Sequence, residues 1–279
     1  MRLDEHLNAN SGVYFEGTLI ESLRTPFQLI EVFDTAALGK LMRIDGANMT
    51  SERDEFFYHE SLVHPAAITH PAPRNVLVVG GGDGGSSEEI LKHPSVERVV
   101  LVELDQGVVD IAKKYFHAVH RGVFANPKLE VRIGDGAAFI KNTAERFDLI
   151  YLDLTDPIGA AEALYRETFY RDCKRALATG GALVMHIGSP FSHPSRVTDS
   201  VANLRAVFSS VAPYFAHIPS YGALWGFAIA SDAIDSRAMA IAEIEQRLAH
   251  GGVSDRQFYN GQTHAAMHAL PEYIEALIG

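Results

Sequence analysis

The spacing of hydrophobic residues changes near residue 70 of the 279-residue chain. Before that point, short runs of β-branched and aromatic residues alternate with glycine and proline, a pattern typical of strands and tight turns. The runs are 13–15, 18–23, 27–33 and 40–44. We therefore expect a small antiparallel sheet in the N-terminal region.

A helix is predicted to follow over 51–69. Ser51 is a suitable N-cap, and Glu52, Asp54 and Glu55 lie near the positive end of the helix dipole. The segment Pro71–Pro73 then interrupts regular structure. We place a domain boundary there, with an N-terminal β-strand domain and linking helix over 1–72 and a catalytic domain over 73–279.

From residue 75 onward, continuous apolar runs alternate with helical patterns. The runs are 76–79, 99–103, 129–133, 147–153 and 182–186, with a helix predicted over 106–116 after the second of them. Strands that are apolar on both faces and alternate with helices are typical of a parallel sheet covered on both sides. The pattern predicts an α/β domain with a doubly wound, Rossmann-like sheet.

Composition narrows the function classes. The formal net charge of −11 argues against nucleic acid as a partner, although acidity alone is common among cytoplasmic proteins. The single cysteine, Cys173, allows no intramolecular disulfide and no cysteine metal cluster. No apolar stretch is long enough to span a membrane, and the polar N-terminus does not resemble a signal peptide. We expect a cytoplasmic protein.

A glycine cluster follows the first strand of the α/β domain and precedes a helix. Gly80, Gly82 and their neighbours in 80–85 would let the backbone approach a nucleotide closely. Glu103 ends the next strand, 21 residues after Gly82, where an acid accepts hydrogen bonds from ribose hydroxyls. Asp135 and Gly136 follow the third strand and suit an adenine amino group. The alternative is a glycine-rich turn with solvent-facing acids.

Asp83 lies inside this glycine cluster. Its charge would repel a pyrophosphate and attract a cation. A sulfonium nucleoside with a cationic tail therefore fits the loop better than a dinucleotide.

Two further acids, Asp153 and Asp156, follow the fourth strand. A carboxylate there can hold an amine and accept its proton, which leaves the nitrogen lone pair free to attack. The alternative for Asp156 is a helix cap, with Pro157 opening the helix.

The segment 52–60 mixes acidic and aromatic residues and is a further candidate for the site. The alternative interpretation is an ordinary amphipathic helix with one face in solvent. The 13 histidines show no metal-ligand spacing, so no metal site is expected.

The chain resembles the spermidine synthase, or polyamine aminopropyltransferase, family along almost its whole length. The matching segments are DEFFYHE (54–60), VLVVGGGDGG (76–85), VELD (102–105), GDG (134–136), DLTDP (153–157), IPSY (218–221), FYN (258–260) and ALPEYI (269–274). The resemblance implies a methyltransferase-type α/β domain, a homodimer or homotetramer, and no permanently bound cofactor. Decarboxylated S-adenosylmethionine would be the co-substrate and a small di- or polyamine the acceptor, with putrescine the default.

The resemblance also implies roles for individual residues. The donor would be bound by Gln28, Asp83, Glu103, Asp135, Gly136 and Asp153. The amine would be bound by Tyr58, His59, Asp83, Asp153, Asp156 and Tyr221. Asp153 would be the general base, with Tyr58 and Tyr221 orienting the attacking nitrogen. Asp83 would reject the carboxylate of ordinary S-adenosylmethionine by charge repulsion.

Several positions depart from the family pattern, mostly around the amine. They are Met49, Glu88, Leu154, Thr155, His186 and Gly188. The acceptor is therefore open among putrescine, cadaverine, agmatine, 1,3-diaminopropane and spermidine. Trp225 is expected either to form a wall of the amine site or to belong to the core. Two other functions remain possible: an S-adenosylmethionine-dependent methyltransferase on the same fold, and a non-catalytic nucleoside- or polyamine-binding protein.

Overall fold

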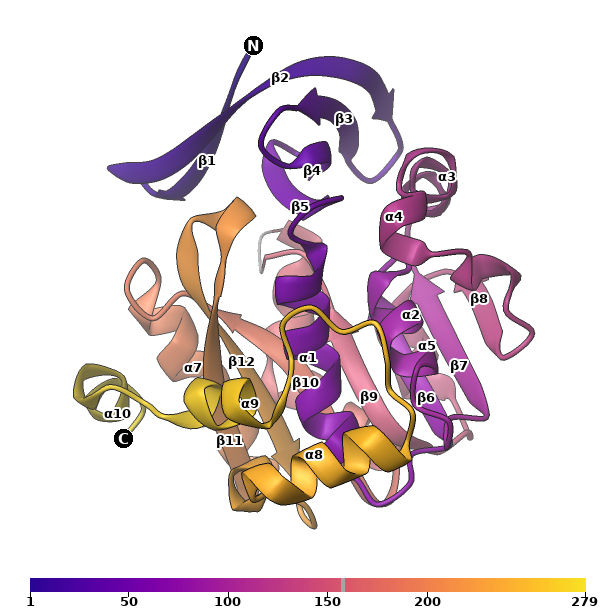
Figure 1. Cartoon of the computed structure of the whole chain (residues 1–279), viewed down its shortest axis with the longest axis vertical. Helices are drawn as coiled ribbons and strands as arrows, with labels where there is room; N and C mark the ends of the chain where they lie inside the picture. The colour runs from indigo at the N-terminus through magenta and orange to yellow at the C-terminus, as the bar shows by residue number, and fades with distance from the viewer. Residues whose placement is uncertain (157–158) are drawn as a thin grey trace.

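The computed structural model describes residues 1–156 and 159–279. Pro157, the expected first residue of a helix, lies outside the described residues. The chain forms two sheets, and the smaller one lies above the carboxyl ends of the strands of the larger one (Figure 1).

The N-terminal sheet is antiparallel, as predicted, and has five strands in sequence order. They are β1 (Arg2–Asn8), β2 (Ser11–Arg24), β3 (Leu29–Thr35), β4 (Gly39–Ile44) and β5 (Ala47–Ser51). The strands β1 and β5 were not predicted, and the runs 13–15 and 18–23 belong to one long strand. The strand continues through Gly17, which pairs with Thr35 and leaves little room for a side chain between Leu3 and Thr35.

Helix α1 (Glu55–Thr69) begins later than the sequence predicts. Ser51 is not its N-cap, because Ser51 pairs with Leu41 as the last residue of β5. Asp54 takes the N-cap position instead, and the Ser51 hydroxyl donates a hydrogen bond of 2.5 Å to the Asp54 carboxylate. The turn between β5 and α1 therefore fixes the start of the helix that carries Tyr58 and His59.

The larger sheet has seven strands in the order β11-β12-β10-β9-β6-β7-β8. Their bounds are β6 (Asn75–Gly80), β7 (Arg98–Glu103), β8 (Leu129–Ile133), β9 (Phe147–Asp153), β10 (Leu177–Gly188), β11 (Ser210–Ile218) and β12 (Ala223–Ser231). The five predicted strands are parallel to one another, which confirms the doubly wound arrangement. The strands β11 and β12 were not predicted, and β12 runs antiparallel to both of its neighbours.

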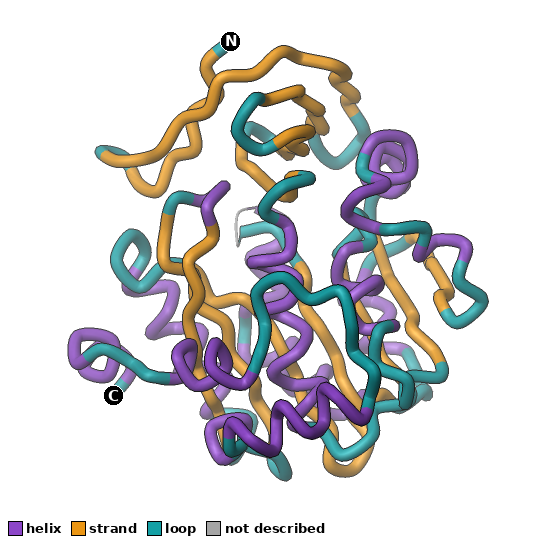
Figure 2. The backbone as a smooth tube through the Cα atoms, viewed as in Figure 1, coloured by secondary structure: helices purple, strands orange, loops and turns teal. Residues whose placement is uncertain are grey.

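Helices cover both faces of the larger sheet. The helices on one face are α1, α2 (Gly85–Leu91), α8 (Ile241–His250) and α9 (Gly261–His268). Those on the other face are α5 (Gly136–Asn142), α6 (Glu167–Ala176), α7 (Pro194–Arg205) and α10 (Glu272–Ile278). Helix α3 (Gln106–Tyr115) lies beside the short α4 (His117–His120), near the N-terminal sheet (Figures 1 and 2).

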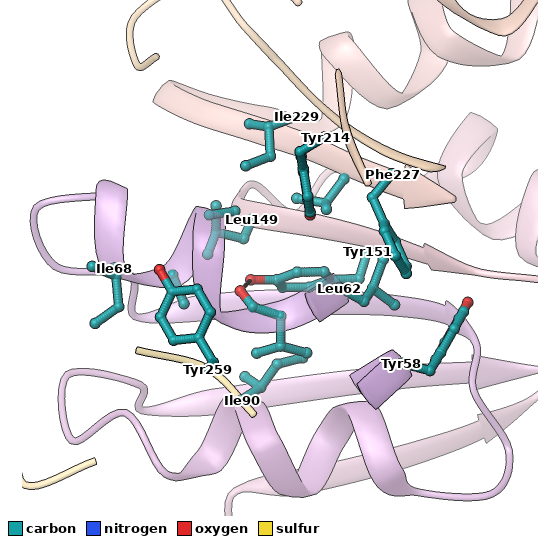
Figure 3. Close-up of a cluster of buried hydrophobic side chains, with 14 of the residues drawn as sticks. Tyr58, Leu62, Ile68, Ile90, Leu149, Tyr151, Tyr214, Phe227, Ile229 and Tyr259 are labelled. Carbon is teal, nitrogen blue, oxygen red and sulfur yellow. Dashed lines mark hydrogen bonds between the residues drawn. The ribbon is translucent and has the colours of Figure 1, made fainter. Parts of the chain in front are cut away.

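The core alternates along each strand, as expected for a sheet buried on both faces. Val76 and Val78 of β6 pack beneath α1, whereas Leu77 and Val79 face the opposite layer. Figure 3 shows the cluster under α1, with Tyr58 at one end of it and Tyr151 and Tyr214 inside. Tyr58 is thus fixed by apolar packing while its hydroxyl reaches the strand ends.

Helix α1 packs against the seven-stranded sheet, although it precedes the predicted boundary. The division at residue 72 stays a prediction. Among the described residues, no helix combines the length and the apolar character that crossing a membrane would require.

Candidate active site

The glycine loop lies directly over the end of β9. Gly80, Gly81 and Gly84 have φ angles of 80°, 65° and 85°, which favour glycine. A Cβ atom at Gly80 would lie 2.1 Å from the carbonyl oxygen of Asp153. The Gly81 amide donates a hydrogen bond of 2.9 Å to that same oxygen. The loop therefore fits tightly against Asp153 at the edge of the sheet, and only glycine fits at its closest point.

Glu103 faces this loop from the end of β7. Its carboxylate accepts hydrogen bonds from the amides of Gly82 (3.2 Å) and Asp105 (2.9 Å). Burial raises the pKa of Glu103 to about 7, and the charges of Asp105 and Asp153 act in the same direction. The Glu103 side chain therefore lies beside the loop with oxygens that can accept hydrogen bonds, as predicted for a residue that binds ribose hydroxyls.

The other residues that the sequence predicts to bind the nucleoside lie along the same edge of the seven-stranded sheet. Gln28 donates a hydrogen bond of 3.0 Å from Nε2 to Asp105, which links the N-terminal sheet to the start of α3. Asp135 caps α5 by accepting from the amides of Ala137 and Ala138. A Cβ atom at Gly136 would lie 2.3 Å from a methyl group of Val79, so the helix and strand meet there.

Asp83 pairs with His59 of α1. His59 Nε2 lies 3.4 Å from the Asp83 carboxylate, and His59 Nδ1 lies 2.8 Å from Glu55. Burial alone would lower the pKa of His59, but the two carboxylates outweigh burial and raise it well above its usual value. The ring approaches α2 so closely that a Cβ atom at Gly85 would lie 2.2 Å from His59 Cε1.

Asp153 lies at the end of β9 with two hydroxyl donors. The hydroxyl of Tyr58 donates at 2.9 Å to one carboxylate oxygen, and that of Ser86 donates at 2.7 Å to the other. Burial raises the pKa of Asp153, and the negative charge of Asp83 raises it further. A carboxylate with a raised pKa is better suited to accept a proton than an ordinary surface aspartate.

A small cavity of about 40 Å³ lies between the N-terminal sheet and the strand ends, and Tyr58, the hydrogen-bond partner of Asp153, lines it. Its walls are Glu5, Ala47, Asn48, Met49, Tyr58, Leu154, Thr155, Asp156, His186, Tyr221 and Trp225. The cavity brings together Tyr58, Asp156 and Tyr221, which the sequence predicts around the amine. Tyr221 is held by a hydrogen bond of 3.1 Å to the carbonyl of Met49, and Trp225 is a wall residue.

His186 is a buried, neutral wall of this cavity. Its Nε2 lies 2.8 Å from both the carbonyl of Leu154 and the hydroxyl of Tyr165. Burial lowers the pKa of His186 to about 4, and the positive charge of Arg196 contributes. With Nε2 protonated toward the carbonyl, Nδ1 is left as an acceptor, and it has no hydrogen-bond partner among the described residues.

Sequence reasoning missed several residues in and around the site, among them Ser86, Glu5 and Arg121. Ser86 lacks a specific signal, since a serine that opens a helix is usually read as ordinary capping. Glu5 lines the cavity from β1, 23 residues before Gln28, the nearest predicted site residue. Arg121 forms ion pairs with Glu55 at 3.0 Å and with Glu88 at 2.8 Å. Its positive charge therefore lies beside Glu88, one of the residues that depart from the family pattern.

One nitrogen of His59 and one oxygen each of Asp83 and Asp153 lie within 4.8 Å of one another. Such a set could hold a divalent cation. However, both ring nitrogens of His59 face carboxylates, which suits a protonated imidazole that donates rather than ligates. We interpret the cluster as a substrate site that attracts cations, and the predicted lack of a metal site stays a prediction.

The spermine/spermidine synthase domain family matches residues 55–238 of the chain. The chain belongs to this family. The matched region contains α1, the glycine loop and the ends of β7, β8 and β9.

Relatives and solved structures extend this match to nearly the whole chain. The polyamine aminopropyltransferase of Nitrosomonas europaea is 48% identical over 275 residues, covering 98% of this chain and 85% of the relative. Polyamine aminopropyltransferase 1 of Pseudomonas aeruginosa is 40% identical over 262 residues, covering 94% and 91%.

A spermidine synthase solved with the transition-state analogue AdoDATO is 32% identical, with a TM-score of 0.93 and coverage of 100% and 95%. The spermidine synthase of Thermotoga maritima gives 31% and 0.90, with coverage of 100% and 94%. The chain is an aminopropyltransferase, as the sequence predicted.

Proposed function

We propose that this enzyme transfers the aminopropyl group of decarboxylated S-adenosylmethionine to a short diamine, with putrescine as the default acceptor, and releases methylthioadenosine. The observation that carries the proposal is the position of Asp153. Its carboxylate lies between the glycine loop on one side and the cavity on the other, and it is bonded to Tyr58, which lines that cavity.

The donor is assigned to the loop side. Glu103 accepts from the ribose hydroxyls, with Gly80 and Gly82 giving the nucleoside its close approach. Asp135 and Gly136 receive the adenine, and Gln28 lies along the methionine-derived part. Asp83 attracts the terminal ammonium of the decarboxylated donor and repels the carboxylate of S-adenosylmethionine.

The acceptor amine is assigned to the cavity. One nitrogen, oriented by Tyr58 and Tyr221, loses its proton to Asp153 and attacks the carbon beside the sulfonium sulfur. The carbon–sulfur bond breaks with its electron pair going to sulfur, so the sulfur becomes neutral and methylthioadenosine leaves. His59 takes part through Asp83, whose position it fixes.

The remote ammonium of the diamine is assigned to Glu5. The carboxylate of Glu5 lines the cavity and accepts a hydrogen bond of 2.7 Å from the amide of Asn48. It forms no ion pair with any described residue, and burial raises its pKa to about 7. A bound ammonium would supply the missing counter-charge.

The experiment that tests the proposal measures release of methylthioadenosine from decarboxylated S-adenosylmethionine, with putrescine, cadaverine, agmatine, 1,3-diaminopropane and spermidine offered one at a time. Release with putrescine supports the assignment. Release with another amine alone replaces putrescine as the acceptor. Methyl transfer from S-adenosylmethionine, with no release of methylthioadenosine, would reject aminopropyl transfer.

A further inference from the structure

Arg196 of α7 lies directly behind the amine cavity. Its guanidinium forms an ion pair of 2.6 Å with Asp156, a wall residue, and lies 5.7 Å from the ring of Trp225, another wall residue. The ring of Tyr165, which bonds to His186, lies 5.8 Å away on the same side. Only 11% of the Arg196 side chain is exposed. The cation is therefore part of the structure that closes the cavity.

The ion pair changes the charge that the cavity offers to an amine. Two of its wall residues are carboxylates in addition to the adjoining general base, namely Glu5 and Asp156. Arg196 already compensates Asp156 and holds its pKa below the ordinary value despite the opposing effect of burial. Glu5 forms no ion pair with any described residue, and the positive charge of Arg43 lowers its pKa less than burial raises it. The cavity thus has one free site for a remote ammonium.

Position 188 shows that Arg196 also fills space. Gly188 has a φ of 86°, and a Cβ atom there would lie 2.9 Å from Cδ of Arg196 and 3.1 Å from its Nε. A side chain at position 188 would therefore force the Arg196 side chain to shift. The guanidinium occupies the space beside Gly188 and next to Asp156.

We propose that Arg196 determines acceptor specificity: by neutralising Asp156 and closing the wall behind it, Arg196 restricts the enzyme to amines with a single remote ammonium. This inference rests on the proposed aminopropyl transfer. A diamine such as putrescine places its one remote ammonium at Glu5. A triamine such as spermidine brings a second remote ammonium, which meets a compensated carboxylate and a neutral His186 backed by a guanidinium.

The test compares kcat/KM for putrescine and spermidine in the wild type and in Arg196→Gln, with release of methylthioadenosine as the readout. We expect the ratio of spermidine to putrescine kcat/KM to rise at least 10-fold in the variant, because Asp156 becomes available to the second ammonium. A residue with a purely structural role would lower both values together. A ratio that stays within twofold of the wild type overturns the proposal.

Two further variants keep the test decisive. Arg196→Met keeps an apolar stem beside Trp225 and removes the charge together with the hydrogen bond to Asp156, so it decides the matter if Arg196→Gln melts at a much lower temperature. Arg171→Gln removes a cation from an exposed ion pair with Glu167 on α6 and is expected to leave the ratio unchanged. If the wild type releases no methylthioadenosine with any amine, the proposed function fails and the specificity proposal fails with it. Wild-type release with an unchanged ratio in both Arg196 variants rejects the specificity proposal alone.

Discussion

The two sides of Asp153, which we propose bind the donor and the acceptor, are built in different ways. The donor side consists of neighbouring loops at the ends of β6, β7 and β8, held by backbone amides and by glycines that permit close contact. The acceptor side gathers β1, β5, α1, β10 and the segment around Tyr221 and Trp225 around one small cavity. Substitutions on the donor side would change the path of the backbone. The acceptor side depends on individual side chains, so its residues can be replaced one at a time.

The largest expected effect comes from the residue that both sides share. Asp153→Asn should lower kcat by about 10³-fold, within the range typical of a lost general base, and leave the affinity for decarboxylated S-adenosylmethionine nearly unchanged. Single-turnover release of methylthioadenosine and calorimetric binding of the donor would measure the two quantities. Asp232→Asn, at an exposed ion pair with Lys174, is the control. An undiminished kcat in Asp153→Asn would remove the residue from the role of base.

A second prediction concerns the stability of the donor side. The folded protein raises the pKa of Glu103 from 4.5 to about 7, so the folded state binds the proton more tightly than the unfolded state. The resulting stabilisation is complete below pH 4.5 and is lost as the pH rises through 7. It amounts to about 3 kcal/mol at 1.36 kcal/mol per pKa unit.

Glu103→Gln lacks this titration. The unfolding free energy of the wild type minus that of the variant should therefore fall by about 3 kcal/mol from pH 4.5 to pH 7.5, as measured by urea denaturation at each pH. A difference that stays constant over this range would mean that Glu103 titrates normally in the folded protein.

Donor selectivity should depend on Asp83. Asp83→Asn removes the charge that opposes the carboxylate of S-adenosylmethionine, so the ratio of the Kd for S-adenosylmethionine to the Kd for the decarboxylated donor should fall by about 30-fold, or about 2 kcal/mol. Titration calorimetry with both nucleosides gives the ratio. Equal weakening of both ligands would show that Asp83 acts only in folding the loop.

The smallest effect is expected at Glu5. Glu5→Gln should raise the KM for putrescine by about 10-fold while the Kd of the donor stays constant, because the variant loses one ammonium contact at the far end of the cavity. Glu16→Gln, on the neighbouring strand β2, is the control. If the KM for putrescine remained at the wild-type value, the remote ammonium would have to be assigned elsewhere.

The same contrast explains what the sequence could reveal. The grouping of Gly80, Asp83, Glu103 and Asp135 at one edge was predictable because strand, glycine loop and helix follow each other directly, and because parallel strands end at one edge of the sheet, whereas Gln28 was named only through the family resemblance. Asp153 and Asp156 were predictable for the same reason. The strands β1 and β5 were missed, since their burial depends on partners elsewhere in the sheet and their sequences are mixed.

The acceptor side was predictable only in part. Tyr58 and Tyr221 were proposed through the family resemblance alone. Glu5 and Arg196 were not predicted, because nothing in their local sequence indicates that strand β1 or helix α7 reaches the cavity. The departure at Gly188 acquires a physical meaning only when Arg196 is found in the space beside it.

The position of helix α1 limits how the substrate preference of this enzyme can evolve. Tyr58 and His59 are successive residues, about 100° apart around the helix, and they contact the acceptor cavity and the donor loop respectively. A rotation or shift of α1 would move Tyr58 at the proposed amine site and His59 at the proposed donor site together. Substitutions that adapt α1 to a new amine are therefore expected to alter the donor affinity too, and new acceptor preferences should arise more readily at β1 and α7, which approach the cavity independently.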